Sequence, residues 1–268
     1  MTGSKALLPP FATPLASASA VGAPAAAGQD TARIWALIPC AGAGARAGTV
    51  QPKQYCLVAG RALVLHTLAA FDAVPRVAGT LVVVSQGDDF LASQAVTGRW
   101  RTAACGGATR AQTVAHGLAE LQLLGAADQD WVVVHDAARC LVTPELIDRL
   151  IDTCQGDTVG GLLAHPVADT LKLAAGDRVA GTTDRDKLWL AQTPQMFRCA
   201  PLRRALAQAG DRVTDESSAI EQLGLAPLLV RGSAQNFKVT YPEDFLLAQA
   251  VLQGRVRKPT TDLDYDYP

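Results

Sequence analysis

The sequence predicts an α/β fold, a three-layer α/β/α sandwich of the Rossmann-like type, and two observations carry this prediction. Short runs of Val, Leu and Ile alternate with longer segments of helical spacing along most of the chain. Such continuous apolar runs are typical of parallel strands, because helices cover both faces of a parallel sheet. The chain has 268 residues and 49% hydrophobic content, which is enough to bury the core of such a domain.

The individual elements follow from these patterns in chain order. We expect buried strands at 34–38, 79–85, 131–135, 159–164 and 228–231, all of them parallel, and a further strand around Lys238. We expect helices where apolar residues recur at helical spacing, at 63–71, 110–124, 144–153, 202–209, 215–223 and 242–252.

One segment, 169–187, breaks the alternation. Its apolar and polar residues surround a turn at Ala175-Gly176-Asp177, which predicts a polar β-hairpin. A hairpin that interrupts an α/β sheet has no obvious core to join, so we expect it to protrude as an arm and to pack on another subunit. An ordinary solvated excursion of the chain is the alternative.

Both ends of the chain are expected to lie outside a domain that spans 31–254. Residues 1–30 are rich in Ala, Pro, Ser and Gly, which predicts a disordered extension, and 255–268 predicts a flexible tail. The extension lacks the continuous apolar segment of a signal peptide and the arginines of a mitochondrial leader, so we expect a cytoplasmic protein. A plastid transit peptide, with a location in the stroma, is the less favoured alternative.

Composition argues against several classes of function. A formal net charge of -1 and 5% aromatic residues argue against a nucleic-acid-binding surface. No window approaches the roughly 20 consecutive apolar residues of a membrane span. Taken together, these observations lead us to expect neither nucleic acid nor a membrane as partner. The six cysteines are scattered, with no C-x-x-C pair, and therefore indicate neither a zinc site nor a disulfide framework.

The strongest functional signal is the loop that follows the first expected strand. Its small residues are Ala41, Gly42, Ala43 and Gly44. They would let backbone N–H groups approach an anion, and Arg46 and Lys53 would answer the charge of a nucleotide triphosphate. No Gly-Lys-Ser/Thr follows, which excludes a Walker loop, and Ala47 stands where the dinucleotide fingerprint needs its third glycine. The pattern predicts a nucleotidyltransferase-type loop, with an ordinary α/β turn as the alternative.

Asp136 is the candidate metal ligand. It comes just after a buried strand, at the carboxyl edge where open α/β sheets hold ligands. A single well-placed carboxylate suffices for a Mg²⁺ ion that bridges phosphates, while an N-cap or turn role is the alternative. We expect the neighbouring His135 to be packed or hydrogen-bonded rather than catalytic.

Three further candidates lie elsewhere in the chain. Gly107, Arg110 and Thr113 mark a second entry from a loop into a helix, which could hold a base or ribose or could be a plain helix start. Placing the charged Lys238 in the middle of a strand costs free energy unless its ammonium reaches a phosphate or a carboxylate. Arg185 follows the hairpin and would be exposed if it had no ligand.

These motifs together resemble the 2-C-methyl-D-erythritol 4-phosphate cytidylyltransferase family, CTP-using enzymes of the non-mevalonate isoprenoid pathway. The resemblance runs from about Ile34 to Leu252, with the motifs in the family's order. They are Pro39 to Gly44 with Arg46, Pro52-Lys53-Gln54, Gly106-Gly107 with Arg110, 134–139, 166–172, Asp184-Arg185 with Leu188-Trp189, Thr193-Pro194-Gln195, Thr214-Asp215-Glu216 and 236–240.

The resemblance implies transfer of CMP from CTP to 2-C-methyl-D-erythritol 4-phosphate with Mg²⁺, in a homodimer. Arg46 and Lys53 would stabilise the transition state, and Arg185 and Lys238 would position the acceptor. The small-residue loop, Gly107, Arg110 and Thr113 would bind CTP. The implied substrate-binding residues are Asp136, which would also hold the metal, Ala137, Arg139, Thr170, Thr193 and Thr214. The arm of the neighbouring subunit would supply Thr170 and Arg185.

The chain departs from the family's usual pattern at several positions. Ala45 precedes a single Arg46 where a basic pair is common, and Cys40, Ala108, Cys140 and Ala168 replace an alanine, an acidic residue, a proline and a basic residue respectively. Two other functions stay open at this point. One is a cytidylyltransferase for ribitol 5-phosphate or another polyol phosphate, and the other is a nucleotide-binding or regulatory module without catalysis.

Overall fold

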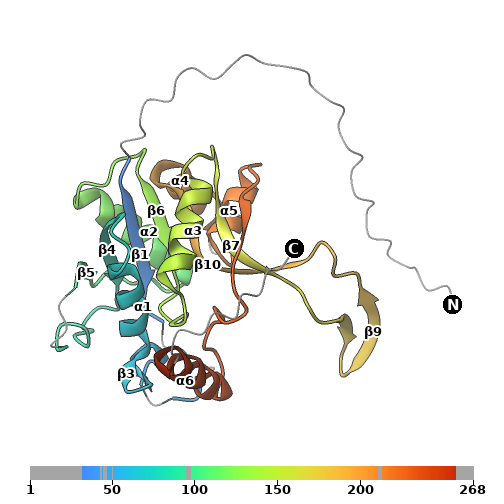
Figure 1. The fold of residues 1–268 in the computed structure, drawn as a ribbon. Coiled ribbons are helices and arrows are strands. Elements are labelled where there is room, and N and C mark those ends of the chain that lie inside the picture. Colours follow the sequence, from blue (N-terminus) through green and yellow to red (C-terminus); the bar gives the residue numbers. More distant parts are fainter. Residues whose placement is uncertain are drawn as a thin grey trace, which may run out of the picture. The chain divides into compact units, whose positions relative to one another are not determined.

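A mixed sheet of seven strands lies at the centre of this computed structural model, which describes residues 32–42, 44, 47–49, 51–94, 98–210 and 213–257. The strand order is β11 (Leu228–Arg231), β7 (Gly160–Pro166), β10 (Trp189–Arg198), β6 (Trp131–Val134), β1 (Ile34–Pro39), β4 (Val77–Val83) and β5 (Trp100–Ala103). Figure 1 shows helices on both sides of this sheet.

Alternate residues of the strands pack against different helices, which makes three layers. On one face, residues such as Ile38 and Val133 form a core with α1 (Leu63–Asp72) and α3 (Pro144–Cys154). On the other face, residues such as Leu37 and Val134 pack against α2 (Arg110–Leu123), α4 (Cys199–Ala209) and α5 (Glu216–Gln222). The three-layer α/β/α prediction is therefore confirmed.

The helices begin where the sequence supplies capping side chains. The Thr109 hydroxyl accepts a hydrogen bond from the Gln112 N–H at the start of α2, and Thr143 plays the same part for α3. Asp215 and Ser218 form a reciprocal capping box at the start of α5. These caps matter for function because α2 and α5 begin beside the cavities described below.

The five strands expected to be parallel do run in one direction, but the sheet also contains an antiparallel strand that was not expected. β10 runs antiparallel to both of its neighbours, β6 and β7. This strand, β10, gives no clear strand signal in the sequence, because the proline of Thr193-Pro194-Gln195 is typical of the end of an element. In the fold, Pro194 follows a cis peptide bond at the point where the register with β7 shifts, so the strand accommodates the proline at an irregularity.

The remaining differences from the predicted elements concern short or irregular segments. The short edge strand β5 and the two-residue strands β2 (Leu57–Val58) and β3 (Arg61–Ala62) have too few residues to give a periodic signal. Lys238 lies in an irregular segment before α6 (Pro242–Arg257), not in a strand. Because α6 continues to Arg257, residues 255–257 belong to a helix rather than to a flexible tail. The predictions for 1–30 and for the rest of the tail lie outside the described residues.

The predicted hairpin forms a two-stranded sheet of its own, made by β8 (Leu171–Ala175) and β9 (Arg178–Thr183). Figure 1 shows it apart from the seven-stranded sheet. No residue from 168 to 190 is buried, and Leu173 and Val179 are 58% and 66% exposed. The arm therefore carries apolar side chains that its own chain does not cover.

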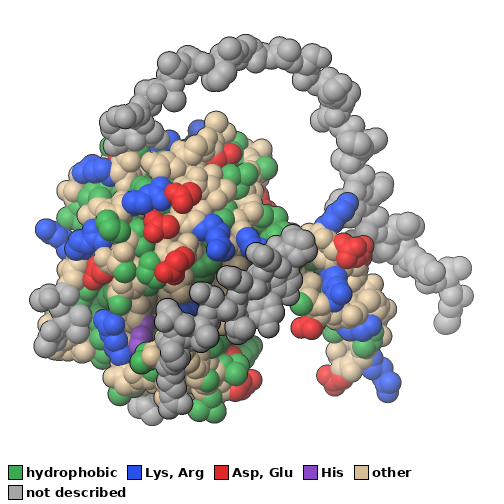
Figure 2. Space-filling model, viewed as in Figure 1, with side chains coloured by type: hydrophobic (Ala, Val, Ile, Leu, Met, Phe, Trp, Pro, Cys, Tyr) green, Lys and Arg blue, Asp and Glu red, His purple; other side chains and the backbone are tan. Residues whose placement is uncertain are grey.

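Charged side chains of both signs share the surface. In Figure 2, basic and acidic side chains are interspersed over the face in view, including the arm. Within the described ranges, no helix combines the length and apolar character needed to cross a bilayer.

Candidate active site

Two adjoining cavities open at the carboxyl ends of β1 and β6. The first has a volume of about 300 Å³, and the second about 200 Å³. Arg110, Asp136 and Lys238 line both cavities, so one cluster of charges lies between them. The first is also lined by Ala41, Gly42, Gly44, Lys53, Gly107, Thr113 and Ala137, and the second by Arg139, Thr193, Thr214 and Asp215.

Lys53 stands at the wall of the first cavity, on a short 3-10 helix, η2 (Lys53–Tyr55). Its Nζ donates a hydrogen bond to the Val239 carbonyl at 2.7 Å. Its stem packs closely on Gly44, where an added Cβ would lie 2.8 Å from Cγ of Lys53 and where φ is +68°. Gly44 is therefore required both for its backbone conformation and for the approach of the lysine. Ala43 and Arg46 lie outside the described residues.

The second loop-to-helix entry lies across the cavity and is held by its own hydrogen bonds. The Gly107 N–H donates to the Thr113 hydroxyl at 3.1 Å, and that hydroxyl donates to the Thr109 carbonyl at 2.9 Å. An added Cβ at Gly107 would lie 2.5 Å from Cβ of Gln112, so a side chain does not fit there. The loop thus brings small residues to the cavity wall, which suits close contact with a flat base or a ribose.

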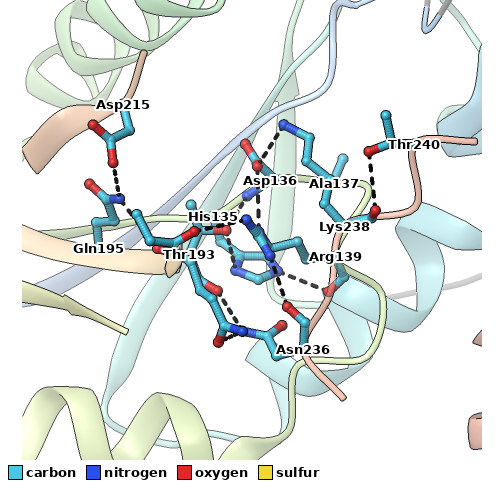
Figure 3. Close-up of polar contacts among 12 residues, drawn as sticks. His135, Asp136, Ala137, Arg139, Thr193, Gln195, Asp215, Asn236, Lys238 and Thr240 are labelled. Carbon is cyan, nitrogen blue, oxygen red and sulfur yellow. Dashed lines mark hydrogen bonds and ion pairs between the residues drawn. The ribbon is translucent and has the colours of Figure 1, made fainter. Parts of the chain in front are cut away.

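The buried Asp136 organises three cations, two of which, Arg139 and Lys238, are seen in Figure 3. Its Oδ1 accepts from Nε of Arg110 at 2.7 Å, its Oδ2 pairs with Nζ of Lys238 at 2.8 Å, and Nε of Arg139 lies 3.7 Å from the same oxygen. Burial raises the pKa of Asp136, but Arg110, Lys238 and Arg139 outweigh that effect and hold the pKa well below its usual value. The carboxylate is therefore ionised at every physiological pH.

Arg110 joins this cluster to the start of α5. Its Nη1 and Nη2 donate to the two carboxylate oxygens of Glu216 at 2.7 and 3.0 Å, and the Glu216 side chain is fully buried. Burial lowers the pKa of Arg110, but Glu216 and Asp136 together raise it above its usual value. These contacts make Arg110 a structural link between α2, β6 and α5, and its expected role as a nucleotide ligand stays a prediction.

This link gives a testable expectation for stability. Replacing Glu216 with Gln should lower the free energy of unfolding by about 3 kcal/mol, because it removes the charge of a fully buried carboxylate that binds the Arg110 guanidinium through both oxygens. Urea denaturation would measure the change, with Glu221→Gln on the exposed side of the same helix as the matched control. An unchanged unfolding midpoint for the Glu216 variant would contradict this account of the link.

His135 contacts the Thr193 hydroxyl that binds the backbone of Asp136, as expected for a packed rather than catalytic residue. It is completely buried, and its Nε2 lies 3.1 Å from the Arg139 carbonyl. Its Nδ1 lies 3.1 Å from the Thr193 hydroxyl, which accepts the Asp136 N–H at 3.0 Å. Burial lowers the pKa of His135 to about 3, so the ring is neutral at neutral pH. A carbonyl only accepts, so Nε2 carries the proton and the Thr193 hydroxyl donates to Nδ1.

The irregular segment that carries Lys238 is fixed by Asn236 (Figure 3). Asn236 is fully buried and donates from Nδ2 to the Thr193 carbonyl at 2.8 Å. Arg139 donates from Nη1 to the Asn236 carbonyl at 2.8 Å. The Val239 N–H donates to the Ala138 carbonyl at 2.9 Å. Lys238 is therefore held between two anchored residues, although it lies outside regular structure.

Two further groups of residues bear on the site. Thr170 and Arg185 lie on the arm, are exposed and line neither cavity, and Arg185 donates to the Ala168 carbonyl. Sequence reasoning assigned no role to Gln54, Glu216 and Asn236, although all three are buried polar residues of the site. Each stands within a motif that carried the family resemblance, which was the available signal for them.

Asp136 alone does not make a divalent-metal site. Each of its oxygens already contacts a cation, and the described residues contain no group of three or more His, Cys, Asp and Glu side chains that could hold a metal ion. A carboxylate suits Mg²⁺ chemically, but an ion held only by Asp136 would lie beside three positive side chains. The protein atoms therefore fit a divalent cation only if a ligand brings further negative charge.

Two cavities that share one cationic cluster suit the passage of a charged group from one bound molecule to another. Together with a glycine loop at the carboxyl edge of a three-layer α/β/α sheet, they define a nucleotidyltransferase. Comparison with known proteins narrows this class. The model of the family IspD, 2-C-methyl-D-erythritol 4-phosphate cytidylyltransferase, matches residues 34–254. The chain belongs to this family.

Similar proteins agree with this assignment. The bifunctional enzyme IspD/IspF of Albidiferax ferrireducens is 63% identical over 228 residues, which cover 85% of this chain and 54% of that protein, so the chain spans about half the length of this relative. The 2-C-methyl-D-erythritol 4-phosphate cytidylyltransferase of Burkholderia cenocepacia (strain HI2424) is 55% identical over 228 residues, or 83% of this chain and 97% of that protein. A crystal structure of 4-diphosphocytidyl-2C-methyl-D-erythritol synthase matches with a TM-score of 0.74 and 42% sequence identity. The match covers 83% of this chain and 99% of the chain in that structure.

Proposed function

We propose that this chain transfers CMP from CTP to 2-C-methyl-D-erythritol 4-phosphate, giving 4-diphosphocytidyl-2-C-methyl-D-erythritol and pyrophosphate. The observation that carries the proposal is the pair of adjoining cavities with Arg110, Asp136 and Lys238 in their common wall, in a chain of this family. The first cavity would hold CTP between the glycine loop and the loop at Gly107. The second would hold the acceptor beside Arg139 and Thr214.

The reaction proceeds by in-line attack of an acceptor phosphate oxygen on the α-phosphorus of CTP. A phosphate monoester is ionised at neutral pH, so no side chain has to remove a proton, and the buried neutral His135 is not needed as a base. Negative charge builds on the non-bridging α-oxygens and on the departing pyrophosphate. Lys53 and the loop N–H groups stabilise that charge at the first cavity, and Lys238 orients the acceptor phosphate from the common wall. By its place in the family motif, Arg46 joins Lys53 in this role.

A divalent cation such as Mg²⁺ belongs to this proposal as a companion of CTP. When bound, it would neutralise phosphate charge and favour expulsion of pyrophosphate. Asp136 is the side chain that could contact it, as the sequence predicted, but its contacts support a different main task. We infer that Asp136 holds Arg110, Arg139 and Lys238 in place, so that these cations meet the phosphates in a fixed arrangement.

The arm supports a homodimer as part of the proposed function. Thr170 and Arg185 line neither cavity of their own chain, and the exposed Leu173 and Val179 need a surface to cover them. We propose that the arm packs on a second copy and brings Thr170 and Arg185 to the acceptor cavity of that copy. A cytoplasmic location also belongs to the proposal.

A mixing experiment tests the arm. Lys53→Met removes a cation of the chain's own cavity, whereas Arg185→Ala removes one that would serve the second copy, so each variant alone should be impaired. When the two variants are unfolded together and refolded, half of the dimers should be mixed and each should keep one intact site, restoring about a quarter of wild-type activity. Activity that stays at the average of the two variants would contradict the shared site.

Pyrophosphate release tests the reaction itself. The assay compares 2-C-methyl-D-erythritol 4-phosphate, ribitol 5-phosphate and no acceptor, each with saturating CTP and Mg²⁺. We expect release with the first acceptor alone, because the family match favours it over the polyol-phosphate alternative. Release with ribitol 5-phosphate instead would overturn the acceptor, and no release under any condition would favour a binding module.

A further inference from the structure

The glycine loop of the first cavity has its carbonyl groups tied back into the protein. The carbonyl oxygens of Cys40 and Gly42 both accept hydrogen bonds from Nε2 of Gln54, each at 3.0 Å. The carbonyl oxygen between them, that of Ala41, accepts from the Ser85 hydroxyl at 2.9 Å. Three consecutive peptide groups of the loop are thus oriented by only two side chains.

This arrangement also fixes the direction of the loop's N–H groups. In a trans peptide the N–H points opposite to the C=O of the preceding residue. Because Cys40 and Ala41 direct their carbonyls toward Gln54 and Ser85, the N–H groups of Ala41 and Gly42 point away from those side chains. No hydrogen bond to another described residue engages the N–H groups of Ala41, Gly42 or Gly44, and all three residues line the cavity. They form a set of donors suited to phosphate oxygens.

Gln54 is built for this task. It is 5% exposed, and one carboxamide nitrogen has two hydrogens, enough for both carbonyls. It directly follows Lys53, whose stem packs on Gly44, so one dipeptide contacts the loop at both ends. The next residue, Tyr55, stacks on Phe90 with ring centroids 4.1 Å apart and donates to Asp88. The turn that presents Gln54 is therefore anchored in the body of the domain.

We propose that Gln54 is a positioning residue that sets the orientation of the amides that bind the CTP triphosphate, with Ser85 holding the peptide between its two contacts. This inference rests on the proposed function, since it assigns the triphosphate to this loop. Gln54 does not contact the reacting atoms. It acts through the backbone, and its loss would allow the loop peptides to turn their carbonyl oxygens toward the phosphates, where the negative charges repel.

The test replaces Gln54 with Met, which keeps the length and volume of the side chain but donates no hydrogen bond. We expect the KM for CTP to rise about tenfold and kcat/KM for CTP to fall about 10- to 100-fold, with an unchanged KM for the acceptor. The matched control is Gln51→Met, since Gln51 lies on the same turn but its amide reaches only Tyr55 and Cys56. A merely structural role would lower the fraction of active protein without a selective change in the KM for CTP.

Two further measurements keep the inference separate from the proposed reaction. Calorimetric titration of CTP into the full chain should show weaker binding by the Gln54 variant even if no acceptor supports turnover. Ser85→Ala, which releases only the Ala41 carbonyl, should give a smaller loss of the same kind and covers the case in which the Gln54 variant does not fold. Wild-type affinity and wild-type KM for CTP in the folded Gln54 variant would overturn the inference.

Discussion

Replacing Lys53 with Met should lower kcat by about 100- to 1,000-fold, the range found when one donor to transition-state charge is removed. Lys53 lines the first cavity, where we propose that CTP binds, and its side chain is held between Gly44 and the Val239 carbonyl. In the proposed reaction, this fixed charge meets the charge that develops on the α-phosphate. Steady-state kinetics with both substrates varied would measure the loss.

Lys53→Arg separates charge from geometry. Arginine keeps the positive charge, but its planar fork cannot take the place of a compact ammonium packed on a glycine. We expect this variant to recover only part of the lost rate, with a KM for the acceptor that stays at the wild-type value in both variants. If Lys53→Met kept more than half of the wild-type kcat, the assigned role of Lys53 would be wrong.

Replacing Asp136 with Asn should damage stability and activity together. The substitution leaves Arg110, Lys238 and Arg139 close together without their common anion, and breaking a buried ion pair in this way costs about 3 kcal/mol or more. Activity should fall about 100-fold in the protein that remains folded, because Lys238 no longer has a fixed position. Urea denaturation and kinetics below the unfolding transition would measure the two effects separately.

The pH dependence of stability gives an independent check on Asp136. Its folded pKa is depressed relative to an unfolded value of about 3.9, so its stabilising contribution is complete above that value and is lost as the pH falls toward the folded pKa. The Asn variant should therefore lose less stability than the wild type between about pH 4 and pH 2. Asp128→Asn, at an exposed pair with Arg203, is the control and should change unfolding by less than about 1 kcal/mol.

Much of the fold was predictable because its signals are local. Runs such as the one that forms β6 are short, rich in valine and flanked by polar residues, which favours a buried strand over a helix. The arm was predictable for the same reason, since its turn and its polar strands have no core to join. β10 was not, because a proline in the middle of a strand is tolerated only where the pairing is irregular, and the neighbouring strands decide that.

The composition of the site was predictable, but its organisation was not. Asp136, Arg110 and Lys238 could each be chosen from the sequence as chemical groups near the edge of the sheet. Their mutual ion pairs depend on three segments that only the tertiary structure brings together. The same holds for Glu216, whose partner Arg110 begins α2, and for Gln54, whose partners lie on the glycine loop, since both pairings join segments that are separate in the sequence. Local patterns identify ligands of a substrate more readily than the residues that hold those ligands in place.

The most direct test of the central claim is ³¹P NMR of the products formed from CTP and 2-C-methyl-D-erythritol 4-phosphate with Mg²⁺. We predict that the acceptor's phosphate signal is replaced by two coupled diphosphate signals while free pyrophosphate appears in equal amount, and that Lys53→Met forms the same products far more slowly. Free CMP with an unchanged acceptor signal, or wild-type rates in the Lys53 variant, would contradict direct transfer across the two cavities.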